Sequence, residues 1–322
     1  MERAKILIAV ALAACGDGGS TTIDAAPPPL PEGWIELAAM PVAVGESAAA
    51  VLDGKVYVAG GFDTLASVQV YDIAEDTWRV GSAMPLGTDN AGAAATAGKV
   101  YVVGGEGAAL LVHDVAGGSW SRGPELPSPR FSSAVELIGG ELHLVGGWSF
   151  DRSNNVSVAT HDVLDLAAGT YERRAAASVA RNHAFSGVID GKLYVTGGRA
   201  PGHEGADASN LTTTEVYDPG ADSWRTLADL PTPRSGGASA VLGGQLYVLG
   251  GGLPGDEVNA VIERYDPASD RWERLPDMPA PVTGHRAIVA GDHIHVFGGF
   301  RTEDGKRVGA VGSRRALRYT PP

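Results

Sequence analysis

The chain has little cysteine, little positive charge and no long helical pattern. Cys15 is the single cysteine among 322 residues, so no disulfide can form within the chain. Lysine and arginine number 25 against 38 acidic residues, and the resulting net charge of −13 argues against nucleic acid as a main partner. No P-loop, dinucleotide fingerprint or Gly-x-Ser-x-Gly motif is present. Beyond the N-terminus no helical periodicity of useful length occurs, which excludes a helical fold.

Glycine, in contrast, is abundant and regularly placed. The chain has 45 glycines, and six short apolar runs end in a Gly-Gly pair. Successive second glycines are 44, 42, 51, 53 and 48 residues apart, a period that indicates repeated supersecondary units. The pairs are Gly60-Gly61, Gly104-Gly105, Gly146-Gly147, Gly197-Gly198, Gly250-Gly251 and Gly298-Gly299.

Each repeat predicts four strands. The run before Gly-Gly is rich in β-branched and aromatic residues, follows a turn pair such as Asp53-Gly54, and is preceded by a strand of small residues such as 47–52. A third strand ends in Asp, as in Tyr71-Asp72, and an aromatic residue six positions later, here Trp78, begins a fourth strand. Six residues past the tryptophan, Met-Pro or Leu-Pro ends the unit.

Gly-Gly, Tyr-Asp and Trp at these offsets resemble the kelch repeat, and the resemblance covers about residues 34–322. It implies an all-β fold, a six-bladed kelch-type β-propeller with four-stranded blades. The third unit departs most, because Leu164 and Tyr171 replace the tyrosine and tryptophan. The sixth unit lacks its tryptophan strand, and an orphan segment begins at Trp34. We therefore expect the N-terminal strand to close the last blade.

The N-terminus has the layout of an export signal. Two basic residues precede the apolar run Ile6 to Ala14, which is too short to span a bilayer. Leu12-Ala-Ala-Cys15 resembles the lipobox of bacterial lipoproteins, which implies lipidation of Cys15; an ordinary secretory signal is the alternative. We expect residues 1–14 to be a lipoprotein signal peptide, 15–33 a lipidated Cys and flexible Pro-rich tether, and 34–322 the propeller. The expected location is the bacterial cell envelope, at the outer membrane or cell surface, because Gly16 rather than Asp follows the cysteine.

The kelch resemblance implies that the links between blades and the loops after Gly-Gly share one face. Arg130, Arg181, Arg234 and Arg286 come from the links, where pairing between blades is the alternative role. Arg199, Phe300 and Trp148 each directly follow a Gly-Gly pair. Trp148 is expected either to contact a ligand or to anchor its loop in the interior. Arg301, Arg307, Arg314 and Arg315 form a local positive cluster, the basic island, which could receive an anionic ligand. Alternatively, they belong to a solvated loop whose charges serve solubility.

The sequence favours a membrane-tethered propeller that binds a protein or an acidic glycan, acts as a monomeric ring and catalyses nothing. We expect no cofactor and no metal. Two rival interpretations stay open: a carbohydrate-active enzyme resembling sialic acid epimerase, and a structural envelope protein. A carboxylate with a strongly raised pKa in the central channel would favour the enzyme, and an apolar loop face without one would favour binding.

Overall fold

The computed structural model describes residues 29–62, 64–105, 109–151, 154–200, 209–254 and 257–322. The chain divides into two units, Met1–Leu30 and Pro31–Pro322, and the account below concerns the second. Within the described residues, no helix has the length and apolar character needed to cross a membrane.

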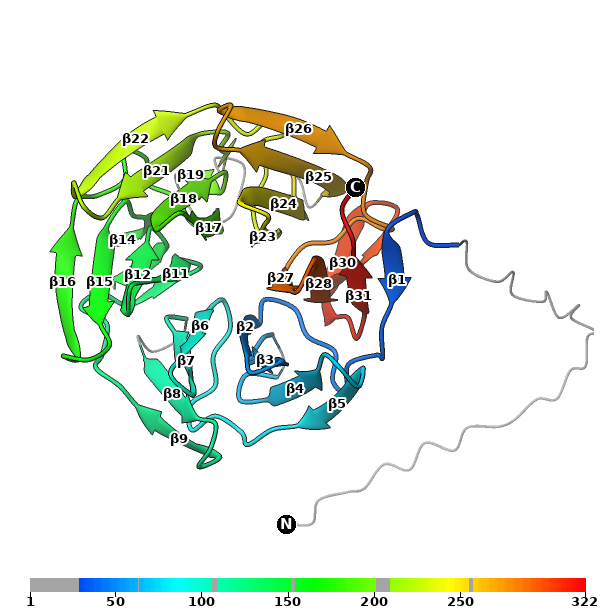
Figure 1. Cartoon of the computed structure of the whole chain (residues 1–322), viewed down its shortest axis with the longest axis horizontal. Helices are drawn as coiled ribbons and strands as arrows, with labels where there is room; N and C mark the ends of the chain where they lie inside the picture. Colours follow the sequence, from blue (N-terminus) through cyan, green and yellow to red (C-terminus); the bar gives the residue numbers. More distant parts are fainter. Residues whose placement is uncertain (1–28, 63, 106–108, 152–153, 201–208, 255–256) are drawn as a thin grey trace, which may run out of the picture. The chain divides into compact units, whose positions relative to one another are not determined.

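In the described part of the chain, six four-stranded antiparallel sheets surround a central channel like blades (Figure 1). The innermost strands, one per blade, are β2 (Ala48–Leu52), β6 (Gly92–Thr96), β11 (Ala134–Ile138), β17 (Phe185–Ile189), β23 (Ala238–Leu242) and β27 (His285–Ala290). The second strands are β3 (Lys55–Ala59), β7 (Lys99–Val103), β12 (Glu141–Val145), β18 (Lys192–Thr196), β24 (Gln245–Gly252) and β28 (His293–Gly298).

The third strands are β4 (Val68–Asp72), β8 (Leu110–Asp114), β15 (His161–Asp165), β21 (Thr214–Asp218), β25 (Val258–Asp266) and β31 (Ala316–Tyr319). The outer strands are β5 (Thr77–Val80), β9 (Ser119–Arg122), β16 (Thr170–Arg174), β22 (Ser223–Leu227), β26 (Arg271–Leu275) and β1 (Trp34–Glu36). Small additional sheets are formed by β10 (Arg130–Phe131), β13 (Trp148–Asp151) and β14 (Asn154–Ser157), by β19 (Arg199–Ala200) and β20 (Ser209–Asn210), and by β29 (Phe300–Glu303) and β30 (Lys306–Gly312).

The predicted closure of the last blade is confirmed. Strand β1 pairs antiparallel with β31, with Trp34 opposite Tyr319. The two rings stack with centroids 4.6 Å apart, and Trp34 is buried. Trp78 of blade one donates its indole N–H to the carbonyl of Ala38, just past β1, at 2.8 Å. Main-chain pairing and a side-chain hydrogen bond therefore both close the ring at this seam.

The aromatic residues that begin the outer strands connect neighbouring blades. Trp120, Trp224 and Trp272 each donate an indole N–H to a carbonyl near the outer strand of the preceding blade, at 2.7 to 2.9 Å. In the divergent third unit, the Tyr171 hydroxyl makes the corresponding contact with the Pro124 carbonyl at 3.4 Å, and β16 is a complete outer strand.

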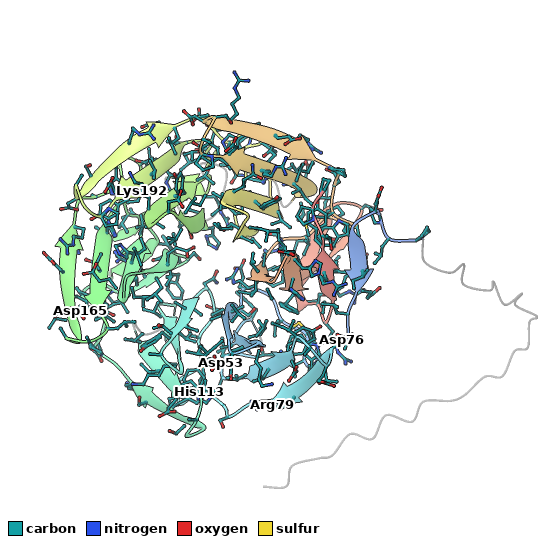
Figure 2. All side chains as sticks on the ribbon, viewed as in Figure 1. Asp53, Asp76, Arg79, His113, Asp165 and Lys192 are labelled. Atoms are coloured by element: carbon teal, nitrogen blue, oxygen red, sulfur yellow. The ribbon has the colours of Figure 1, made fainter. Side chains whose placement is uncertain are left out.

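A second aspartate, four residues past the first, strengthens these joints. The carboxylate of Asp76, labelled in Figure 2, accepts hydrogen bonds from the Tyr71 hydroxyl at 2.8 Å and from the Ala38 N–H at 2.9 Å. Tyr217 and Tyr265 have the same partner in Asp222 and Asp270, at 2.7 Å. Burial, and secondarily these bonds, raise the pKa of each of the three tyrosines far above its usual value.

The Gly-Gly pairs occupy backbone positions that other residues resist. Gly60 and Gly61 have φ angles of 68° and 109°, and a Cβ on Gly60 would lie 2.2 Å from the Thr88 carbonyl oxygen. The N–H of Gly61 donates to that carbonyl at 3.0 Å, which ties blade one to the link before blade two. Glycine is required here because the chain must approach its neighbour this closely.

Candidate functional site

Six residues, one from each blade, form a closed circle of main-chain hydrogen bonds that we call the amide ring. Its members are Glu46, Asn90, Ser132, His183, Gly236 and Gly284. Each N–H donates to the carbonyl of the preceding member at 2.7 to 3.0 Å, and Glu46 completes the circle by donating to Gly284. All six have left-handed φ angles, between 50° and 69°. This conformation is strained for a non-glycine residue and is held by the surrounding structure.

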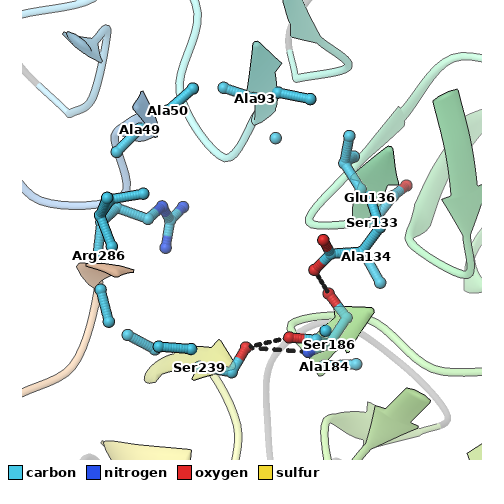
Figure 3. A pocket seen from close by; sticks show the side chains of 18 of the residues that line it. Ala49, Ala50, Ala93, Ser133, Ala134, Glu136, Ala184, Ser186, Ser239 and Arg286 are labelled. Carbon is cyan, nitrogen blue, oxygen red and sulfur yellow. Dashed lines mark hydrogen bonds between the residues drawn. The ribbon is translucent and has the colours of Figure 1, made fainter. Parts of the chain in front are cut away.

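A cavity of about 450 Å³ occupies the channel and is lined by five members of the amide ring and by the innermost strands. Figure 3 shows the small side chains of Ala49, Ala93 and Ala184 on its wall. Small residues on the inner strands leave this space open because large side chains would fill it. The cavity therefore has the size of a small-molecule or side-chain binding site.

Arg286 and Glu46 place opposite charges in this cavity. Arg286 lies on β27, and its guanidinium, which projects into the channel in Figure 3, is 3.9 Å from the Glu46 carboxylate. Burial raises the pKa of Glu46, while the positive charges of Arg286, Arg199 and Arg307 oppose that rise. Three guanidinium groups thus act on one carboxylate at this end of the channel.

Glu136 is a second carboxylate in the channel, on β11. One of its oxygens accepts a hydrogen bond from the Ser186 hydroxyl at 2.8 Å, and Ser186 is linked to Ser239 on the next blade. Desolvation raises the pKa of Glu136 to about 7, against a smaller lowering by Ser186. Glu136 can therefore both hold and release a proton near neutral pH.

A directed series of side-chain hydrogen bonds runs through the amide ring. Ser132 Oγ lies 3.0 Å from His183 Nε2, and His183 Nδ1 lies 2.5 Å from Asn182 Oδ1. Asn182 donates from Nδ2 to Ser157 Oγ at 2.7 Å, and Ser157 donates to the carbonyl of Arg199 at 3.4 Å. Asn182 is fully buried, while Ser132 and His183 line the cavity.

Three of the link arginines lie in the interior. Arg130, Arg181 and Arg234 are at most 1% exposed, so the structure removes them from the expected binding face. They form ion pairs with carboxylates on the third strands of blades three, four and five, namely Asp162, Glu215 and Glu263. In each case the backbone carbonyl of the arginine also accepts the second Gly-Gly N–H of the preceding blade, so the residue joins two blades. The side chain thus pairs with the blade that follows the link, and the carbonyl with the blade before it.

Trp148, Arg199 and Phe300 differ in their surroundings. Trp148 is half-buried on β13, with its ring tilted against Phe131 at 5.9 Å. Arg199 is half-buried on β19 and exchanges main-chain hydrogen bonds with Asn182 at 2.9 and 3.0 Å. Phe300 is only 2% exposed and packs against Gly284 of the amide ring, so it supports the ring and does not line the channel.

The arginines of the basic island lie on and after the β29–β30 hairpin. Arg301 is exposed and lies 3.7 Å from Glu303, while exposed Arg307 stacks over the Phe300 ring at 5.0 Å. Arg314 donates its Nε–H to the Met40 carbonyl, which holds it at the blade-six seam. Arg315 and Arg301 line a separate cavity of about 200 Å³ beside Phe300. Of the island, Arg307 is thus the residue that also acts on Glu46.

The sequence interpretation missed the amide ring and Glu136. Each ring member precedes the second glycine of its own Gly-Gly pair by 15 residues, a constant offset that could have identified the set. Glu136 is the only acidic residue in the innermost strands, which are otherwise mostly small and apolar, and that departure was its signal. In the described ranges, no group of three or more His, Cys, Asp or Glu residues is arranged to hold a metal ion.

Comparisons with known proteins agree on the repeat. A sequence profile described as the KLHDC2/KLHL20/DRC7 Kelch-repeats domain matches residues 90–299, and a Kelch motif profile matches residues 45–85. An F-box/kelch-repeat protein of Arabidopsis thaliana is 35% identical over 100 residues, which is 30% of this chain and 25% of that protein. Alpha-scruin of Limulus polyphemus is 35% identical over 95 residues, which is 30% of this chain and 10% of that protein. The chain thus matches a quarter or less of the length of these relatives.

A solved structure described as "Structure of YjhT" is similar in fold. The TM-score is 0.74 at 14% sequence identity, and the match covers 88% of this chain and 96% of that chain. At this identity the likeness concerns the arrangement of the blades and not the site.

Proposed function

Because a Kelch-repeats profile matches more than half of it, this chain belongs to the kelch-repeat family of β-propellers, and we propose that it is a binding module whose ligand enters the central channel through the amide ring. The observation that carries the proposal is Arg286, a guanidinium projecting into a cavity of about 450 Å³. Arg199 and Arg307 add positive charge at the same end. A partly desolvated guanidinium favours a carboxylate or another planar anion, so the proposed ligand is an acidic glycan or an acidic segment of a protein.

Binding of an acidic polysaccharide tests this proposal. Polygalacturonate would be titrated into the full chain at low and high salt, with neutral dextran as the control ligand. Arg286→Met should abolish polygalacturonate binding, whereas Arg79→Ser, which removes an exposed arginine from β5 (Figure 2), should leave it unchanged. Exposed charge pairs are screened over a Debye length of about 8 Å at physiological ionic strength, so binding should weaken with salt.

A second variant separates the channel from the basic island. Changing Arg301, Arg307, Arg314 and Arg315 to Ser removes the island and leaves Arg286 in place. Binding that survives Arg286→Met and is lost in the fourfold variant would move the site to the hairpin. Equal binding of dextran and polygalacturonate would refute an anion site altogether.

A second candidate function is acid–base chemistry on a carbohydrate, in an enzyme resembling sialic acid epimerase. The observation that favours it is Glu136, because a carboxylate whose pKa is about 7 lies in the channel, as that interpretation requires. Exchange between the anomers of an acidic sugar, followed by NMR, is the test. Wild type should accelerate the exchange and Glu136→Gln should not, with the rate depending on pH near 7.

We also propose that the propeller is attached to a bacterial membrane. Support comes from Leu12-Ala-Ala-Cys15 after a short apolar run, although Cys15 lies outside the described residues. In this proposal residues 1–14 are removed, Cys15 carries the lipid, and residues up to 33 connect it to the propeller. The location is then the cell envelope, at the outer membrane or cell surface.

A further inference from the structure

We propose that Ser132 and His183, positioned by Asn182, form a nucleophilic site at the amide ring that cleaves carboxylic esters. The arrangement of a hydroxyl, an imidazole and an amide oxygen is that of a nucleophile, its base and an orienting group. The separations are 3.0 Å from Ser132 Oγ to His183 Nε2 and 2.5 Å from His183 Nδ1 to Asn182 Oδ1. Because Ser132 and His183 line the cavity, a ligand in the channel reaches the hydroxyl.

The hydrogen-bond series determines which nitrogen of His183 carries the proton. The Arg199 carbonyl can only accept, so Ser157 donates to it and accepts from the Asn182 amide nitrogen. Asn182 therefore presents its oxygen to His183, and Nδ1 must be the donor. In the neutral imidazole Nε2 then carries no proton, and it can accept from the Ser132 hydroxyl, as a general base requires, once that hydroxyl turns to it from Asn90 Oδ1.

The backbone of Ser132 and of His183 is strained, and backbone strain of this kind clusters at functional sites. Ser132 and His183 have φ angles of 50° and 51°, and both are held there by the amide ring. In this structure the Ser132 hydroxyl also lies within donating distance of Asn90 Oδ1, at 3.0 Å. When the hydroxyl hydrogen points to His183, rotation of the Asn90 amide lets its nitrogen donate to Oγ, which stabilises negative charge developing there.

The chemistry requires only an ester and water. Ser132 Oγ attacks the ester carbonyl carbon while its proton passes to His183 Nε2. The bond to the alcohol oxygen then breaks, and Nε2 returns the proton to the departing alcohol, which leaves an acyl ester on Ser132. Water attacks this ester, gives a proton to Nε2, and displaces the carboxylic acid as Ser132 Oγ regains its hydrogen.

Two uncharged probes test the site in the full chain, so the result does not depend on anion binding at Arg286. A fluorophosphonate should attach to Ser132, detected by peptide mass spectrometry, and p-nitrophenyl acetate should be hydrolysed. Ser132→Ala should lose the label, and Ser132→Ala and His183→Gln should each lower kcat/KM by about 100-fold or more. Ser133→Ala is the matched control, because the Ser133 hydroxyl donates to the Gly146 carbonyl and not to an imidazole.

Asn182 acts through His183, so its test needs a readout that a structural role would not change. Asn182→Asp places a negative charge beside Nδ1, which should raise the pKa of the imidazole and move the acidic limb of the pH–rate profile upward. Retained melting temperatures show that the variants are folded. Absence of label on Ser132 in folded wild type, equal loss in Ser133→Ala, or an unmoved pH profile in Asn182→Asp would each overturn the proposal.

Discussion

Breaking one buried ion pair should destabilise the propeller far more than breaking an exposed pair one residue away. Arg234 and Glu263 have side chains that are 0% and 2% exposed, with an N–O distance of 2.6 Å. The second carboxylate oxygen accepts from Thr232 at 2.7 Å, and Arg234 also donates to the Val248 carbonyl at 3.1 Å. Removing either partner leaves an uncompensated charge in the interior, which typically costs about 3 to 5 kcal/mol.

The assay is urea-induced unfolding followed by tryptophan fluorescence. Glu263→Gln and Arg234→Met should each lower the free energy of unfolding by that amount. The double variant should cost less than the sum of the two, because no charge is then left unpaired. Arg264, which follows Glu263 on β25, and Glu273 on the neighbouring strand β26 are 20% and 60% exposed and form the control pair. Breaking that pair should cost about 1 kcal/mol or less. Additive single variants, or an equal cost for the exposed pair, would refute this account of how the blades are joined.

Three further predictions concern the seam, the channel and the N-terminus. Trp34→Ala should lower the free energy of unfolding by about 3 to 5 kcal/mol because the indole is buried. Deleting residues 1–33 should leave a folded ring, whereas deleting residues 1–42 should cause aggregation. Equal melting temperatures for the two truncations would contradict closure by β1. Glu136 has a folded pKa of about 7 against a usual 4.5, so its stabilising contribution is complete below about pH 4.5 and is lost as the pH rises through 7. Glu136→Gln should therefore reduce the loss of stability between pH 5 and pH 8 in thermal melts, and an unchanged loss would argue against the raised pKa. Cys15→Ser should release the protein from bacterial membranes or block its processing, and a wild type that partitions wholly into the aqueous phase of a detergent extract would contradict lipidation.

The strands could be predicted from sequence because each depends on local chemistry. Asp53-Gly54 has positive φ at both residues, as a two-residue hairpin requires, and the small-residue segments became the innermost strands. Closure by Trp34 was also readable, because its offset to Met40-Pro41 repeats that of the other tryptophans. These signals recur six times, so errors in one unit are corrected by the rest.

The site could be predicted only in part, because it depends on how the blades meet. The sequence assigns four arginines to the links, yet Arg234 is buried against Glu263 while Arg286, four residues further along its repeat, projects into the channel. The sequence does show this difference. In the last repeat, the position that corresponds to Arg234 is Val282 and the position that corresponds to Glu263 is Leu317, so the arginine and its carboxylate partner are both replaced by apolar residues. Ser132 and His183, in contrast, are 51 residues apart and meet only because the ring closes.

The amide ring sets the aperture of the channel independently of its lining. Its six bonds join main-chain atoms, so the opening cannot dilate unless at least one amide–carbonyl bond breaks. The side chains carried by the ring, in contrast, differ from blade to blade: two of the six members are glycines and the other four are Glu, Asn, Ser and His. The main chain therefore fixes the width of the opening, while the side chains around it can vary at the four non-glycine positions; at Gly284 a Cβ would lie 2.8 Å from the Phe300 ring. Substitution at those four positions would change which ligands the opening admits and leave its main-chain width unaltered.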